Sequence, residues 1–201
     1  MCEKLSLRVT NKLVKLKIIN IKDFDVYKYG FELLISLVST IAIIIVISAI
    51  VGKFGKTVIY LTGFFCVRAI CGGFHAKHHY SCFIITILTY IIFLLLDSLL
   101  YIVPNIRIFL GALVLLSFIS IICLAPVEHP NNPMTMYRKR KSKVLSVAFS
   151  IVLLLIFAAA FKLNALTKIF SSFFIGVFIA SVSIIVAEIE KSFLIRKEVQ
   201  Q

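Results

Sequence analysis

The feature that most constrains this chain is a series of long runs too apolar to face water. Ile108–Val127, for example, is a stretch of 20 residues without a charged side chain. A helix needs about 20 residues to cross the hydrocarbon of a bilayer, with a range of roughly 17–25. Hydrophobic residues make up 61% of the chain and charged residues only 15%, and the charges cluster between the apolar runs. The sequence therefore predicts an all-α integral membrane protein.

Six apolar runs are predicted to cross the membrane, and the whole chain, 1–201, is predicted to form a single membrane domain. The predicted spans are 31–51, 57–71, 80–103, 108–127, 144–161 and 169–187. The run 57–71 is short for a full crossing, so a re-entrant segment is the alternative there. A basic amphipathic segment, 1–29, precedes the spans, and a tail, 188–201, follows them.

The N-terminal segment has the pattern of a helix that lies in the membrane interface. Its apolar residues recur at helical spacing and alternate with lysines and one arginine. The apolar residues are Leu5, Val9, Leu13, Leu16 and Ile19. Such a helix places its cations on anionic headgroups, and the alternative is a solvated terminus. The segment has no uninterrupted apolar core or small-residue cleavage site, so it is not expected to be a secretory signal.

Charge and cysteine usage narrow the class further. The net charge is +13, and because the cations flank the apolar runs, an anionic lipid bilayer is the expected partner rather than nucleic acid. A negatively charged substrate segment is a second use for this charge. The five cysteines lie in or beside apolar runs, so free thiols are predicted instead of a disulfide framework.

The distribution of basic residues predicts the orientation. If all six runs cross and the N-terminus is inside, 16 of the 22 Lys and Arg residues lie on the inner side and five on the outer side. If 57–71 did not cross, the basic segment MYRKRKSK would fall outside, against the positive-inside tendency. The sequence therefore predicts a multi-pass protein with both termini cytoplasmic and Cys71–Ser81 at the inner face.

The chemistry-bearing residues gather in one stretch, RAICGGFHAKHHYSC, from Arg68 to Cys82. Titratable groups at a membrane boundary are costly and indicate function. An imidazole can accept the thiol proton of Cys82 and leave the attacking thiolate. Cys82 lies seven positions after His75, which is about 10 Å along a straight helix, so this pair requires a break that Gly72 and Gly73 permit. His78 and His79 lie closer to Cys82 in the sequence and are the competing bases, and His78 is one helical turn before Cys82.

Other interpretations of this stretch remain open on the residues alone. His75 with His79, and His78 with Cys82, are four residues apart and could face one metal ion on a helix. That spacing favours a metal-binding transporter or metallopeptidase as the alternative function, although no acidic residue lies between the histidines as in HExxH. Interfacial histidines in a non-catalytic membrane assembly protein are the third interpretation.

The same stretch resembles a known family. Arg68, Gly73, the run from Phe74 through His75 and Ala76 to Lys77, and Cys82 match the pattern of the accessory gene regulator B family of bacterial membrane endopeptidases. The length, the span number, the basic start and the basic segment after Ala125–Val127 also agree, so the resemblance covers nearly the whole chain. The residues at 78 and 79 depart mildly from the family pattern, which leaves the identity of the base open.

The resemblance implies a thiol protease of the bacterial cell membrane that processes a quorum-sensing propeptide. It implies that Cys82 attacks a peptide bond near the C-terminal end of the precursor, with His75 as the general base. A Cys or Ser within the peptide then attacks the resulting thioester and closes a thiolactone or lactone ring. The expected partner is a short precursor peptide with an amphipathic N-terminal part and an acidic C-terminal tail. A homodimer is the oligomer that the resemblance suggests.

No cofactor or metal is expected in this interpretation, because thioester exchange is nearly balanced and no phosphate-binding Gly loop is present. Supporting or substrate-binding roles fall to residues in two places along the chain. They are Arg68, Gly73, Lys77, Arg138, Lys139 and Arg140. For Arg68 the alternative is a helix-end side chain that reaches headgroups, and for the basic segment it is a topology determinant. Asp97 is expected to orient a polar partner inside the bundle, with Arg68 or a histidine as the candidates.

Overall fold

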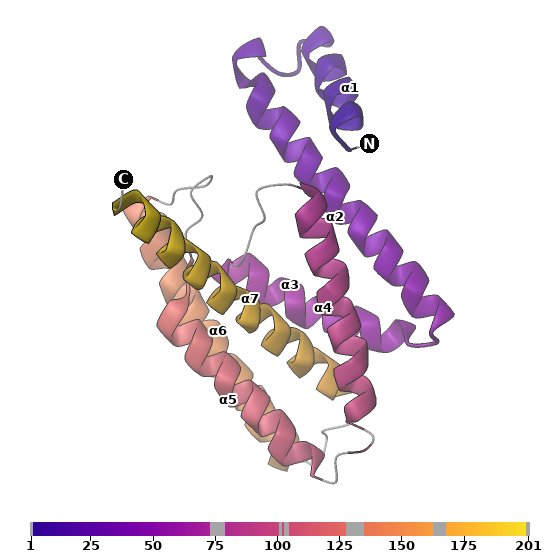
Figure 1. Cartoon of the computed structure of the whole chain (residues 1–201), viewed down its shortest axis with the longest axis vertical. Coiled ribbons are helices and arrows are strands. Elements are labelled where there is room, and N and C mark those ends of the chain that lie inside the picture. Colours follow the sequence, from indigo (N-terminus) through magenta and orange to yellow (C-terminus); the bar gives the residue numbers. More distant parts are fainter. Residues whose placement is uncertain are drawn as a thin grey trace. The chain divides into compact units, whose positions relative to one another are not determined.

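The computed structural model describes residues 2–72, 79–100, 102, 105–127, 135–162 and 168–199 (Figure 1). Over these residues the regular secondary structure is entirely helical. A short 3-10 turn, Ile21–Asp23, joins the first two helices. The helices are α1 (Cys2–Lys15), α2 (Phe24–Ile50), α3 (Phe54–Cys71), α4 (His79–Leu99), α5 (Ile106–Leu124), α6 (Met136–Lys162) and α7 (Lys168–Val199).

The prediction of an all-α membrane protein is confirmed. Within the described residues, five helices are long and apolar enough to cross a membrane, and the apolar part of α4, Phe83–Leu99, is shorter. Every predicted span coincides with a helix because a backbone in hydrocarbon must satisfy its N–H and C=O groups internally. The number of crossings and the side on which the termini lie stay predictions.

Three helices extend beyond the apolar runs. α6 begins at Met136, eight residues before the predicted span, and includes the basic segment. α7 continues to Val199, and α2 begins at Phe24. Charged residues end a membrane span without ending a helix, because Lys, Arg and Glu are good helix formers. The hydroxyl of Thr135 accepts a hydrogen bond from the Arg138 N–H at 3.4 Å, as an N-cap residue does.

The chain divides into two compact units, and the first consists of residues 1–52 and 76–90. In this unit α1 folds back along the first part of α2 (Figure 1). Ser6 and Thr10 are fully buried, whereas Leu5 and Val9 on the same helix are exposed. The small polar residues of α1 therefore face α2, and its apolar stripe faces outward.

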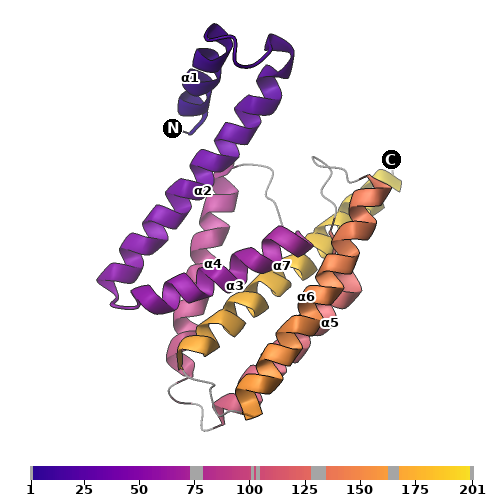
Figure 2. The same ribbon diagram turned by 180° about the vertical axis from the view of Figure 1, so that it is seen from behind.

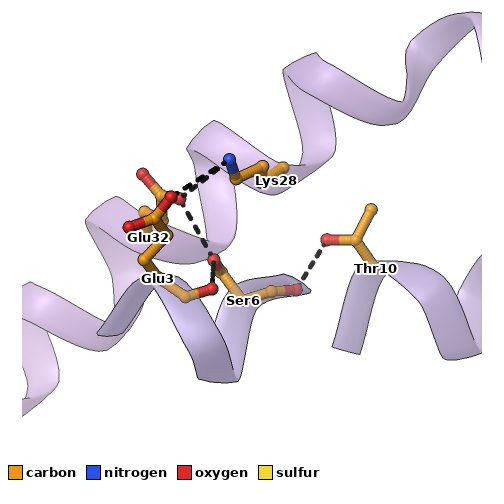
Figure 3. Close-up of polar contacts among 5 residues, drawn as sticks. All are labelled: Glu3, Ser6, Thr10, Lys28 and Glu32. Atoms are coloured by element: carbon orange, nitrogen blue, oxygen red, sulfur yellow. Dashed lines mark hydrogen bonds and ion pairs between the residues drawn. The ribbon is translucent and has the colours of Figure 1, made fainter. Parts of the chain in front are cut away.

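A buried carboxylate holds the two helices of this unit together (Figure 3). The Ser6 hydroxyl lies 3.2 Å from Oε1 of Glu32 in α2, and 2.9 Å from the Glu3 carbonyl oxygen. The Lys28 ammonium lies 3.8 Å from Glu32 and 3.7 Å from the Glu3 carboxylate. The predicted N-terminal helix is thus anchored to the first long helix, so the alternative of a frayed terminus is wrong, and its place in the membrane interface stays a prediction.

The second unit consists of residues 53–75 and 91–201 and has α7 at its centre. α7 packs between α3 and α5, and α6 packs on α5 and against α3 (Figure 2). A Cβ added to Gly176 would collide with the carbonyl oxygen of Tyr60, and one added to Gly63 would lie 2.5 Å from that of Phe173. These two glycines let the backbones of α3 and α7 touch, which is how helices gain contact in lipid.

Candidate functional site

The structure places some of the predicted site residues and leaves others outside its described part. Gly73, His75, Lys77 and His78 are not among the described residues. The backbone of Cys82 lies in the first turn of α4, within the first unit, and its side chain is likewise not described. The pairing of Cys82 with a histidine therefore stays a prediction.

Arg68 lies in the last turn of α3 and turns back along that helix. Its guanidinium carbon lies 5.6 Å from the centre of the Phe64 ring, one turn earlier. Side chains of a helix tilt toward its N-terminus, so this direction is the ordinary one. An arginine on an aromatic face gains a cation–π contact. The half-buried side chain is thus directed into the bundle instead of beyond the end of α3.

The end of α3 is a sharp turn that only glycine makes without strain. Gly72 follows Cys71 with φ of +76° and donates its N–H to the Arg68 carbonyl oxygen at 3.2 Å. A Cβ at Gly72 would lie 3.2 Å from the carbonyl oxygen of Val127. The expectation of permissive backbone before His75 is confirmed at Gly72, which both turns the chain and lets a second segment come close.

The last carbonyls of α3 accept hydrogen bonds from two other elements. The Ser142 hydroxyl of α6 donates to the Ile70 carbonyl at 2.8 Å, and the Val127 N–H donates to the Cys71 carbonyl at 3.3 Å. The structure therefore brings the beginning of α6, the residues after α5 and the end of α3 to one place. Sequence reasoning had linked them only through the family pattern.

A second helix end at this place is held by Lys143. Its ammonium donates to the carbonyl oxygens of Ile122 and Ala125, at 2.7 Å for Ala125. Sequence reasoning had counted Lys143 only as part of the basic segment. The signal that it overlooked is Pro126, which lacks the N–H that would otherwise bond the Ile122 carbonyl four residues earlier.

The predicted basic residues form the start of α6. Arg138 and Arg140 are exposed and Lys139 is half-buried, all within the first turns of the helix. A helix N-terminus carries a partial positive charge from its free N–H groups. Cations placed at that end add to the dipole instead of opposing it, so this terminus attracts anions strongly.

Asp97 has different partners from those expected. It lies near the end of α4, fully buried, with Lys53 and Lys56 from the start of α3 at 2.8 and 2.6 Å from its two oxygens. Arg68 is twelve residues beyond Lys56, about 18 Å along the helix, so it is not the partner of Asp97. The expectation that Arg68 pairs with Asp97 was wrong, because the start of α3, and not its end, lies beside Asp97.

The structure describes only some of the side chains that could bind a metal ion. Among the described residues no three His, Cys, Asp or Glu side chains gather closely enough for a metal ion. The alternative metal site draws on His75, His78, His79 and Cys82, whose side chains lie outside that part of the structure. Cys66, Cys71 and Cys123 are free thiols, as predicted.

Comparison with known proteins decides the family. A sequence profile described as Accessory gene regulator B matches residues 6–184. The chain belongs to the accessory gene regulator B family. This family member therefore has a role in the accessory gene regulator system, and the match takes in the whole stretch from Arg68 to Cys82. The resemblance noted in the sequence is confirmed.

A relative and the solved structures complete the comparison. AgrB-like protein 1 of Clostridium perfringens (strain 13 / Type A) is 28% identical over 129 residues. The aligned part is 62% of this chain and 66% of that protein, so the chain spans just under two thirds of the relative it matches. No solved structure matches this family member.

Proposed function

We propose that this protein is a membrane cysteine endopeptidase that removes the C-terminal tail of a quorum-sensing propeptide and closes the remaining peptide into a ring. The observation that carries the proposal is the family match over 6–184, because it includes the Arg–Gly–His–Cys pattern from Arg68 to Cys82. The membrane fold and the strongly basic start of α6 support the same conclusion.

The proposed reaction has two acyl transfers and needs no cofactor. His75 takes the proton of the Cys82 thiol, and the thiolate attacks the carbonyl carbon of the scissile peptide bond. The carbon–nitrogen bond breaks, the imidazolium gives its proton to the departing amine, and the peptide is held as a thioester. A Cys or Ser inside the peptide then attacks that thioester, which forms the ring and returns Cys82 to its thiol form.

The position of Cys82 in the chain suits the first step. It is the fourth residue of α4, and the N-terminus of a helix favours a negative charge such as a thiolate. Water would hydrolyse the thioester before the ring closes, so a site at a membrane boundary that excludes water favours cyclisation. Release of the cleaved tail shifts the equilibrium of the first acyl transfer toward the thioester.

The acidic tail of the precursor is proposed to bind the start of α6. Arg138, Lys139 and Arg140 provide cations, and the helix N-terminus adds its own partial charge. Arg68 is proposed to serve the same tail or the thiolate. In this proposal both termini and these basic residues lie on the cytoplasmic side of a bacterial cell membrane, in agreement with the positive-inside tendency.

The proposal is tested with the purified protein in proteoliposomes and a synthetic precursor peptide taken from a neighbouring short reading frame. Cys82→Ala should abolish cleavage and leave no peptide thioester on the protein, as read by mass spectrometry. Cys123→Ala, an exposed thiol in α5, is the matched control and should cleave normally. Normal cleavage by Cys82→Ala would remove the proposal.

The base is tested with two neighbouring histidines. His75→Ala should abolish thioester formation, whereas His78→Ala should not, and the reverse result would transfer the role of the base to His78. A chelator should leave the rate unchanged. Loss of activity with chelator and its return with Zn²⁺ would instead favour the metallopeptidase alternative.

A further inference from the structure

Gly72 is the last described residue before the segment that carries His75. The end of α3, just before Gly72, accepts hydrogen bonds from other parts of the chain. A helix leaves its last four carbonyls without partners inside the helix. In α3, the carbonyls of Ile70 and Cys71 receive the Ser142 hydroxyl and the Val127 N–H, at 2.8 and 3.3 Å. The end of α3 is therefore fixed from two sides, from α6 and from the residues after α5.

The donor from the residues after α5 is itself fixed, because Lys143 holds the end of that helix. Pro126 has no N–H to donate to the Ile122 carbonyl, and a carbonyl left unpaired in an apolar place destabilises the fold. Lys143 supplies this missing donor and also bonds the Ala125 carbonyl, two residues before Val127. A cation at a helix C-terminus is also favoured by the dipole.

Ser142 and Lys143 are consecutive, so one turn of α6 holds the ends of two other helices. Ser142 bonds the end of α3 directly, and Lys143 holds the segment that carries Val127. Gly72 also lies against that segment, because its position leaves only 3.2 Å between an added Cβ and the Val127 carbonyl oxygen. These contacts join the start of α6, the residues after α5 and the end of α3 around Gly72.

We infer that Ser142 and Lys143 are positioning residues, which fix the point where the segment carrying His75 leaves α3. This inference rests on the proposed function. It also divides the basic segment into two parts with different tasks. Arg138 and Arg140 are exposed and available to an acidic peptide, whereas Lys143 is half-buried and already bonded to two carbonyl oxygens.

The test compares variants in the proteoliposome assay with the precursor peptide. Lys143→Met keeps the length of the side chain but removes its donors, and it should lower kcat for thioester formation by about 10- to 100-fold with KM nearly unchanged, since small misplacements of reacting groups have effects of this size. Lys143→Arg retains donors and should recover most of the rate. Lys162→Met, an exposed cation at the other end of α6, should behave as the unaltered protein.

A second pair of variants tests the direct bond to α3. Ser142→Ala should lower kcat by about three- to tenfold, because it removes one hydrogen bond to a partly buried carbonyl. Ser120→Ala is the control, since that exposed hydroxyl bonds only a carbonyl of its own helix. Equal effects of the two alanine variants would contradict the inference.

A readout that does not depend on activity keeps the inference testable if Lys143→Met is poorly active for other reasons. Cys71 is fully buried at the end of α3, and Cys66 on the same helix is half-buried. Loss of the bonds around Gly72 should raise the alkylation rate of Cys71 at least several-fold and leave that of Cys66 unchanged, as mapped by peptide mass spectrometry. An unchanged Cys71 rate, or an equal rise at both thiols, would overturn the inference.

The two proposals fail in different ways. If Cys82→Ala cleaves the precursor, the proposed function is wrong whatever the Lys143 variants do. If cleavage depends on Cys82 but Lys143→Met retains a full kcat, the proposed function stands and the positioning role is wrong. A rise in KM without a fall in kcat would place Lys143 with the peptide-binding cations and would equally overturn the inference.

Discussion

Replacing Asp97 by asparagine should destabilise the contact between the start of α3 and the end of α4. The carboxylate is fully buried and has two ammonium groups within 2.8 Å, so its loss leaves Lys53 and Lys56 without their counter-charge. Breaking a buried ion pair by removing one partner costs about 3–5 kcal/mol. The lysine side chains are 23% and 16% exposed, so they can turn toward water and the cost should fall near the low end, about 3 kcal/mol.

The three charges should also be strongly non-additive. Removing both amines, with Lys53→Met and Lys56→Met, leaves a buried carboxylate without a partner and should cost about 3–5 kcal/mol. Removing all three charges leaves no uncompensated charge, so the triple variant should lie within about 1–2 kcal/mol of the unaltered protein. Either single lysine variant should cost about 1 kcal/mol, because the other lysine still pairs with Asp97.

The assay is reversible unfolding in mixed micelles, followed by circular dichroism, on the complete set of variants. Lys162→Met serves as the control for loss of one positive charge at an exposed site. If the effects of the Asp97 variant and the double lysine variant simply add in the triple variant, the three residues do not act as one buried cluster, and the reasoning is refuted.

Three further perturbations test other parts of the structure. Gly176→Ala should cost about 1–3 kcal/mol, because its Cβ meets the Tyr60 carbonyl; Gly111→Ala, which meets only a flexible ring at 3.6 Å, should unfold like the unaltered protein. Gly72→Ala should cost about 1–2 kcal/mol through its positive φ, and an unchanged midpoint would contradict the turn. Glu32→Leu should expose α1 to trypsin at its lysines several-fold faster, since the buried acceptor for α1 is lost; equal digestion rates would argue against that anchor.

The helical fold could be predicted from the sequence because each apolar run must satisfy its own backbone hydrogen bonds in hydrocarbon. A stretch such as 108–127 has no structure available in hydrocarbon except one that bonds its own backbone, so α5 could be predicted without any knowledge of its neighbours. The ends of the helices could not, because residues 136–143 are too basic for the hydrocarbon and yet favourable for a helix. Hydropathy predicts which residues lie in the hydrocarbon, whereas helix propensity predicts how far the helix extends beyond them.

Contacts between helices were much harder to predict. Lys56 and Asp97 are 41 residues apart, and their pairing follows only when the start of α3 is known to lie beside the end of α4. The donor role of Lys143 requires both the missing N–H of Pro126 and the packing of α6 on α5. For the candidate site, sequence reasoning named the chemistry from Arg68 to Cys82 and the turn at Gly72, but its geometry at His75 depends on residues outside the described part.

The outward direction of Leu5 and Val9 on α1 predicts how deep this helix lies in a membrane. Its leucines are stable in hydrocarbon and its lysines in headgroups, so we expect α1 to lie at the boundary between them. Through the Ser6 hydroxyl it holds Glu32 at that same level. From there to Ile50, α2 has 18 residues left, about 27 Å of helix, which is close to the roughly 30 Å of hydrocarbon that a crossing must cover.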